Sequence, residues 1–277
     1  MKLSNTVLAV AITFSAPNLA NAASVELKNL HASVEVIPEN RSDVAVEVHA
    51  SNGRLRAPTV TRVGDSVVID GGPWGARGCD GDADLERGMN APGHGWVRSR
   101  PALAITIHTP RAVVVKANGS IVGNVRPAGA VDLTTTGCSR WRIADVAGVL
   151  SIQQAGAATI EAGSAGAAHL ELSGVSHVDL RSVRALNVDM SGAGKVRLNS
   201  ISGPVDADLS GIGSVTIASG RAQRVKAEVS GMGGFTLHGS AAALDADVSG
   251  IGSVHVDRVD GAVHKSVSGI GRVSVGA

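Results

Sequence analysis

The hexapeptide Ser249–Val254, SGIGSV, stands unchanged at Ser210–Val215 and nearly unchanged, as SGIGRV, at Ser268–Val273. One such glycine-rich hexapeptide is enough to cradle a phosphate, but several copies cannot share one ligand. When the chain is aligned on the first glycine, related hexapeptides recur every 18 to 20 residues at nine glycines: Gly119, Gly137, Gly156, Gly174, Gly192, Gly211, Gly231, Gly250 and Gly269. A period near 19 residues held this long indicates a structural repeat.

Apolar residues alternate with other residues on both sides of each bend. Val205, Ala207 and Leu209 take alternate positions before one bend, and Val215 and Ile217 do so after it. This period of two is typical of half-buried β-strands. A unit this short cannot bury its apolar face alone, so successive units must stack. We predict an all-β fold, a single-stranded right-handed parallel β-helix (β-solenoid) with coils of about 19 residues; the variable spacing argues against the left-handed hexapeptide type.

The hexapeptide itself is expected to form the corner of each coil. Its glycines would allow positive φ angles at a sharp bend, and the isoleucine between them would fill the corner from inside. A dinucleotide-binding loop would instead require a helix to start at the last glycine. A strand pattern follows each time, so the phosphate-loop interpretation is disfavoured.

The first 22 residues read as a signal peptide. Lys2 precedes the apolar run Val7–Phe14, and Ala20–Ala22 forms a small-x-small cleavage site. We expect the mature chain to begin at Ala23 and to be periplasmic or secreted. No later stretch is apolar for long enough to form a membrane-spanning helix.

The composition argues against one class of partner, limits which residues can form the core and predicts the redox state of the two cysteines. The formal net charge is +1 and basic residues form no blocks, which argues against nucleic acid as a partner. Tyrosine is absent and other aromatic residues are few, so the core must consist of Val, Ile, Leu and Ala. Cys79 and Cys138 in an oxidising compartment predict one disulfide; the alternative is two free buried thiols.

The chain divides into the signal peptide, an N-terminal β region over residues 23–110 and a β-helix of about nine coils over residues 111–277. The N-terminal strands either cap the first coil or form irregular opening coils. A loop over residues 71–100 lacks periodicity, and long loops are often functional. The candidate loop site consists of Trp74, Asp80, Asp82, Asp84 and Trp96.

The acids of this loop resemble the start of a calcium-binding loop. Leu85 and Ala91 stand where such a loop has glycine and glutamate. Solvated loop acids are therefore the favoured interpretation over a calcium site.

A stripe of carboxylates is expected on the outside of the coils, two positions before the serine of successive repeats: Glu171, Asp189, Asp208, Glu228 and Asp247. Stacked coils place such residues about 4.8 Å apart. The stripe is a solvated acidic face, a weak divalent-cation site, or the carboxylate pair of a glycosidic active site. The sequence has no Ser/His/Asp arrangement, zinc spacing or P-loop, so we predict no catalytic residue and no cofactor beyond weakly bound calcium.

The repeated SGIGSV and SGMGGF hexapeptides, the exported N-terminus and the stretch VELKNLHASVEVIPENRSDVAVEVHA followed by VGDSVVIDGG resemble the bacterial head GIN domain family, known as the "putative auto-transporter adhesin" family. The likeness runs from Val25 to the end. It implies a right-handed β-helix in the cell envelope without established enzymatic activity.

We therefore expect a non-enzymatic envelope protein that presents surfaces for adhesion or interaction. Its partner would be an envelope or surface component, a glycan or a protein, and a homo-oligomer stays open. The alternative is a carbohydrate-active enzyme, a lyase or hydrolase, on the same scaffold. A groove beside the acidic stripe that holds paired acids and a basic residue would favour the enzyme.

Overall fold

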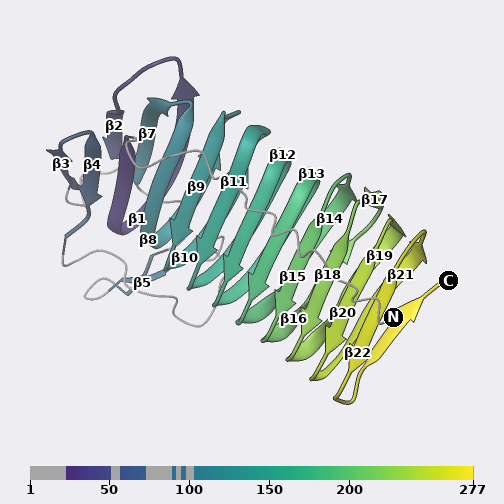
Figure 1. Cartoon of the computed structure of the whole chain (residues 1–277). Helices are drawn as coiled ribbons and strands as arrows, with labels where there is room; N and C mark the ends of the chain where they lie inside the picture. Colours follow the sequence, from purple (N-terminus) through teal and green to yellow (C-terminus); the bar gives the residue numbers. More distant parts are fainter. Residues whose placement is uncertain (1–22, 51–56, 73–88, 92–94, 98–102, 277) are drawn as a thin grey trace, which may run out of the picture.

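The structure is a computed structural model that describes residues 23–50, 57–72, 89–91, 95–97 and 103–276. These residues form 23 strands and no helix. Twenty-one of the strands belong to one sheet, which winds as a parallel β-solenoid (Figure 1). The predicted all-β solenoid with coils of about 19 residues is thus confirmed. The predicted signal peptide, residues 1–22, lies outside the described residues.

Each coil of the solenoid pairs in parallel with the next. Val215 lies opposite Phe235, and Ala207 lies opposite Ala227, one repeat further along the chain. The strands from residue 112 onward are β8 (Ala112–Val125), β9 (Ala130–Thr135), β10 (Cys138–Ile143), β11 (Val146–Gln154), β12 (Ala157–Leu172), β13 (Val175–Met190), β14 (Ala193–Ile201), β15 (Val205–Leu209), β16 (Ile212–Ile217), β17 (Arg221–Ala222), β18 (Val225–Val229), β19 (Met232–Ala241), β20 (Leu244–Val248), β21 (Ile251–Val259), β22 (Val263–Val267) and β23 (Arg272–Val275).

The core is a stack of thin aliphatic layers. The alternating residues predicted to point inward are buried on both sides of the bend, as Ala207 before it and Val215 after it show. A third side of the coil is closed by residues such as Ile201, about ten positions past the serine. The two largest fully buried side chains are Trp141 and Phe235. The burial pattern confirms the predicted strand alternation.

The corner glycines are required for a reason other than the predicted one. Of the nine, only Gly119 has a positive φ in the left-handed range, 137°. Instead, each corner packs against the backbone of the coil before it. A Cβ added at Gly211 would lie 1.9 Å from the carbonyl oxygen of Gly192, and the other corners are as tight. At the other eight corners, close backbone approach and not φ excludes every larger side chain.

The predicted position of the corner isoleucines is wrong. Ile212 and Ile251 were expected inside the corner, but their exposed fractions are 58% and 56%, and Met232 at the equivalent position is 50% exposed. The strand that starts at each of them sends its next inward side chain, such as Val215, into the core three residues later. The residue between the two glycines therefore points to solvent.

The N-terminal strands belong to the same sheet. The long strand β1 (Ser24–Glu39) pairs in parallel with β8 on one edge and with β4 (Ser66–Asp70) and β7 (Leu103–Pro110) on the other. β1 comes first among the described strands in the sequence, but it belongs to the second coil of the solenoid, next to the outermost coil that contains β4 and β7 (Figure 1). The outermost coil is closed by two antiparallel strands, β2 (Ala45–Ala50) on β7 and β3 (Thr59–Val63) on β4. Both predicted roles of this region, opening coil and cap, are present.

The predicted loop over residues 71–100 leaves the outermost coil at its corner, between β4 and β7. Within it, β5 (Met89–Ala91) and β6 (Gly95–Val97) form a separate antiparallel pair in which Trp96 lies opposite Asn90. Four of the candidate loop residues lie outside the described residues: Trp74, Asp80, Asp82 and Asp84.

Candidate functional site

An apolar ridge runs along the corner of the solenoid. Register stacks the residue between the two glycines of successive coils, so that Ala193, Ile212 and Met232 follow one another. We define the corner ridge as Val175, Ala193, Ile212, Met232, Ile251 and Ile270, all of which are exposed. Val175 is 63% exposed and Ile270 is 81% exposed. Apart from the small Ala193, this is a row of large apolar side chains in solvent, which is unusual in a soluble protein and typical of interaction surfaces.

The acidic stripe predicted from the sequence lies on the face that precedes the bend. Register places Glu171, Asp189, Asp208, Glu228 and Asp247 opposite one another in consecutive coils. The neighbouring outward column adds Asp206, Lys226 and Asp245. Four positions along the chain separate Asp208 from Ile212, so the stripe runs beside the ridge.

The stripe is electrostatically crowded in its middle. Partial burial raises the pKa of Asp208, and the carboxylates of Asp189 and Glu228 in the adjacent coils raise it further. Lys226 relieves part of this repulsion, because its Nζ lies 2.7 Å from Glu228 Oε1. The hydrogen bond to Glu228 raises the pKa of Lys226.

Most carboxylates of this face have no ion-pair partner among the described residues. Arg224 forms an ion pair with Asp245 at 3.2 Å, and Lys226 forms one with Glu228. The carboxylates that no ion pair reaches in the part of the chain that the structure describes are Glu171, Asp189, Asp206, Asp208 and Asp247. The face beside the ridge therefore carries an excess of negative charge.

The stacked carboxylates do not converge on one point. Among the described residues, no group of three or more His, Cys, Asp or Glu side chains is placed to hold a metal ion. This arrangement follows from the solenoid geometry, which spreads equivalent side chains along a line.

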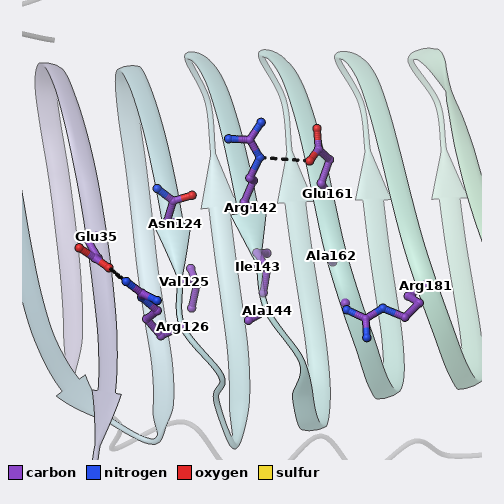
Figure 2. Close-up of a pocket in the computed structure, with 11 residues that line it drawn as sticks. Glu35, Asn124, Val125, Arg126, Arg142, Ile143, Ala144, Glu161, Ala162 and Arg181 are labelled. Atoms are coloured by element: carbon purple, nitrogen blue, oxygen red, sulfur yellow. Dashed lines mark hydrogen bonds and ion pairs between the residues drawn. The ribbon is translucent and has the colours of Figure 1, made fainter. Parts of the chain in front are cut away.

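A hollow of about 570 Å³ lies on the other face, after the bend (Figure 2). Its lining residues, which we call the arginine hollow, are Glu35, Asn124, Val125, Arg126, Arg142, Ile143, Ala144, Glu161, Ala162, Gly163 and Arg181. The hollow exists because small residues replace larger ones in two columns of side chains that stack from coil to coil. Ala162 stands in the inward column that holds Ile143 and Leu180 in the adjacent coils. Ala144 and Gly163 stand in the next column along the chain, where the coils on either side carry Arg126 and Arg181.

Only one of the two cysteines of the predicted disulfide lies within the described residues. Cys138 begins β10 and is 8% exposed, and it directly follows the corner glycine Gly137. Cys79 lies outside the described residues, so the bond stays a prediction.

Sequence reasoning missed both the ridge and the hollow. The ridge was hidden because apolar residues between glycines were assigned to the core by hydrophobicity alone. A signal for the hollow was present: Ala144 and Gly163 stand at equivalent positions of consecutive coils that are flanked by coils with Arg126 and Arg181. Reading that signal requires knowing which columns face outward.

Residues 90–220 match the family model described as "Putative auto-transporter adhesin, head GIN domain". The match begins within β5, includes β6 to β16 and ends just before β17, while the same repeat continues to β23. The family resemblance read from the sequence is thus confirmed. No curated protein matches the chain. No described helix is long and apolar enough to cross a membrane.

Proposed function

We propose, from the match of residues 90–220 to the head GIN domain family, that this chain is an exported, non-enzymatic β-helix protein of the cell envelope that binds a partner protein through its corner ridge. The family description supports an adhesin-like role. The observation that carries the proposal is the row of exposed apolar side chains, of which Ile212, Met232 and Ile251 form the centre.

The ridge has the length of a short helix. From Val175 to Ile270 it crosses five coil steps, or about 24 Å at the spacing of paired strands. A helix of about 16 residues has this length. From Ala193 onward, glycines on both sides of each ridge residue leave the ridge standing clear of its neighbours, whereas Val175 has a glycine only before it.

The charge beside the ridge selects the partner's chemistry. Because Asp206, Asp208 and Asp247 are unpaired within the described residues, an approaching acidic segment would be repelled. A segment with an apolar stripe flanked by lysine or arginine would cover the ridge and neutralise the stripe. The proposed partner is a cationic amphipathic segment of another envelope protein.

A direct test measures binding of an amphipathic lysine–leucine peptide of about five helical turns by fluorescence anisotropy. The triple variant Ile212→Ser, Met232→Ser, Ile251→Ser should weaken binding by about tenfold or more, because each side chain loses its buried apolar contact. The double variant Asp208→Asn, Asp247→Asn should weaken binding and reduce its salt dependence.

The matched control is Val60→Ser with Val63→Ser, which removes exposed valines of β3 away from the ridge. This variant should bind the peptide like the parent. Equal affinity of the ridge variant and the parent would refute the proposal, as would equally tight binding of a glutamate–leucine peptide of the same length.

A further inference from the structure

The arginine hollow collects guanidinium groups from separate coils around one apolar floor. Arg126 follows β8, Arg142 lies in β10 and Arg181 lies in β13. Val125 and Ile143 form the floor and are each 3% exposed. In Figure 2, Arg181 reaches back from its strand toward Ala162. The small residues leave room for a ligand between the charged groups.

Two of the arginines are held in place by carboxylates. Arg126 donates from Nε and Nη2 to Glu35 Oε1 at 2.7 and 2.6 Å. Arg142 donates from Nε to Glu161 Oε2 at 3.2 Å. These bonds orient the guanidinium planes before a ligand arrives, which lowers the cost of ordering them.

Donors remain for a ligand. Among the described residues, the terminal amino groups of Arg142 have no hydrogen-bond partner. Arg181 Nη1 lies 3.6 Å from Asp145 Oδ1, beyond hydrogen-bond length, and that oxygen already accepts a bond from the backbone N–H of Ser164. Each of the three arginines has one carboxylate beside it, Glu35, Glu161 or Asp145, so the attraction for an anion comes from guanidinium N–H groups that these carboxylates leave without a hydrogen bond. Guanidinium forks match the planar geometry of carboxylates.

The hollow also offers acceptors for hydroxyl groups. Glu35 and Glu161 each keep a carboxylate oxygen without a partner among the described residues, and Asn124 stands opposite Glu35 in the adjacent coil. These groups would repel a ligand made only of phosphates, but they accept hydrogen bonds from sugar hydroxyls. A ligand with both hydroxyl donors and oxyanions fits the two kinds of group together.

The spacing of the arginines sets the ligand's length. Arg126 and Arg181 are three coil steps apart, about 14 Å at the spacing of paired strands. One oxyanion cannot reach both. We propose that the arginine hollow is a binding site for an acidic oligosaccharide, a chain of a few sugars that carries carboxylate groups. Its volume lies in the range of about 300–1,000 Å³ that is typical of ligand pockets.

The test is calorimetric titration of the full chain with trigalacturonic acid. Arg142→Gln should weaken binding by about tenfold, because it removes charge-assisted hydrogen bonds. Ala144→Gln should abolish binding by filling the hollow. Arg197→Gln is the matched control, since Arg197 stands in the same outward column as Arg142 but outside the hollow. It should change the dissociation constant less than about twofold, as a surface charge does.

Two further ligands separate charge from sugar recognition. Maltotriose, which has hydroxyls without charge, should bind far more weakly, and so should tripolyphosphate, which has charge without hydroxyls. Equal losses in Arg142→Gln and Arg197→Gln would overturn the proposal, because they would indicate unspecific attraction. Binding of either further ligand as tight as trigalacturonic acid would overturn it too, as would no heat with any ligand.

Discussion

At the scale of single residues, the corner glycines show that a repeated glycine can be dictated by the neighbouring coil. Each lacks room for a Cβ because a carbonyl oxygen of the previous coil occupies that space. Sequence periodicity was enough to find these positions. It could not distinguish conformational need from close approach, since both demand glycine.

Gly211→Ala should therefore destabilise the solenoid. The new Cβ would lie 1.9 Å from the Gly192 oxygen, and relieving that overlap must shift two coils apart. Overpacking of this kind costs about 1–3 kcal/mol or more, which should lower the denaturant midpoint. Gly129→Ala is the control, because its nearest atom lies 3.3 Å away. Equal midpoints for the two variants would contradict the steric explanation.

Because of Asp208, the acidic stripe should make the stability of the fold depend on pH. Its pKa is raised in the folded protein by desolvation and by neighbouring carboxylates, so the folded state binds the proton more readily than the unfolded state does. The free energy of unfolding therefore falls as pH rises from the ordinary aspartate pKa through the raised one.

Asp208→Asn should increase the melting temperature at pH 7 by up to about 3 °C, and the gain should vanish near pH 3, where both forms are neutral. Asp179→Asn, on the opposite face, should give no gain, because Asp179 has the guanidinium of Arg197 at 4.0 Å and the ring nitrogen of His177 at 2.9 Å beside it. A gain for Asp208→Asn that persists unchanged at pH 3 would show that charge is not the cause.

At the scale of strands, packing between coils compensates for unusual residues. Trp141 in β10 lies opposite Gly123 in β8, and a Cβ at Gly123 would fall 2.1 Å from the indole ring. The glycine therefore makes room in its own coil for a tryptophan from the next one. Sequence alternation predicted which strands exist, but the pairing of a glycine with a large ring one coil away is visible only once the register is known.

The pair should behave as a unit in a double-mutant cycle. Trp141→Val should cost about 3–5 kcal/mol through the cavity it leaves, and Gly123→Val should cost stability through overlap with the ring. The double variant restores the aliphatic pattern of the other coils, so it should be more stable than the sum of the two losses predicts, by about 0.5–3 kcal/mol. Additive losses, measured by urea unfolding followed by circular dichroism, would contradict this compensation.

The position of β1 could not be predicted from the sequence. Repeat periodicity orders coils as they occur along the chain, whereas β1 enters between strands that follow it by tens of residues. Its alternating pattern in SVEVI predicted a strand only, because the identity of its partners depends on contacts distant in sequence. The same limit applies to the arginine hollow, whose Glu35 comes from β1 and whose Arg181 comes from β13.

At the scale of the whole molecule, the two ends of the solenoid are held differently. β1 is paired on both edges, with eleven residue pairs to β8, four to β4 and seven to β7. Within the described residues, β22 pairs only with β20, through five residue pairs.

This asymmetry has a mechanical consequence. When the chain is stretched between its ends, as in optical-tweezer experiments, the coil of β22 should peel first, and each following coil should release about 65 Å of contour, the extended length of about 19 residues. The N-terminal end should yield last, because extracting β1 means tearing two ladders at once. A first rupture that frees the N-terminal strands would contradict this order. A cell that holds this protein by its N-terminal end would thus have a tether that lengthens under load. The tether would dissipate mechanical energy one coil at a time before the N-terminal strands give way.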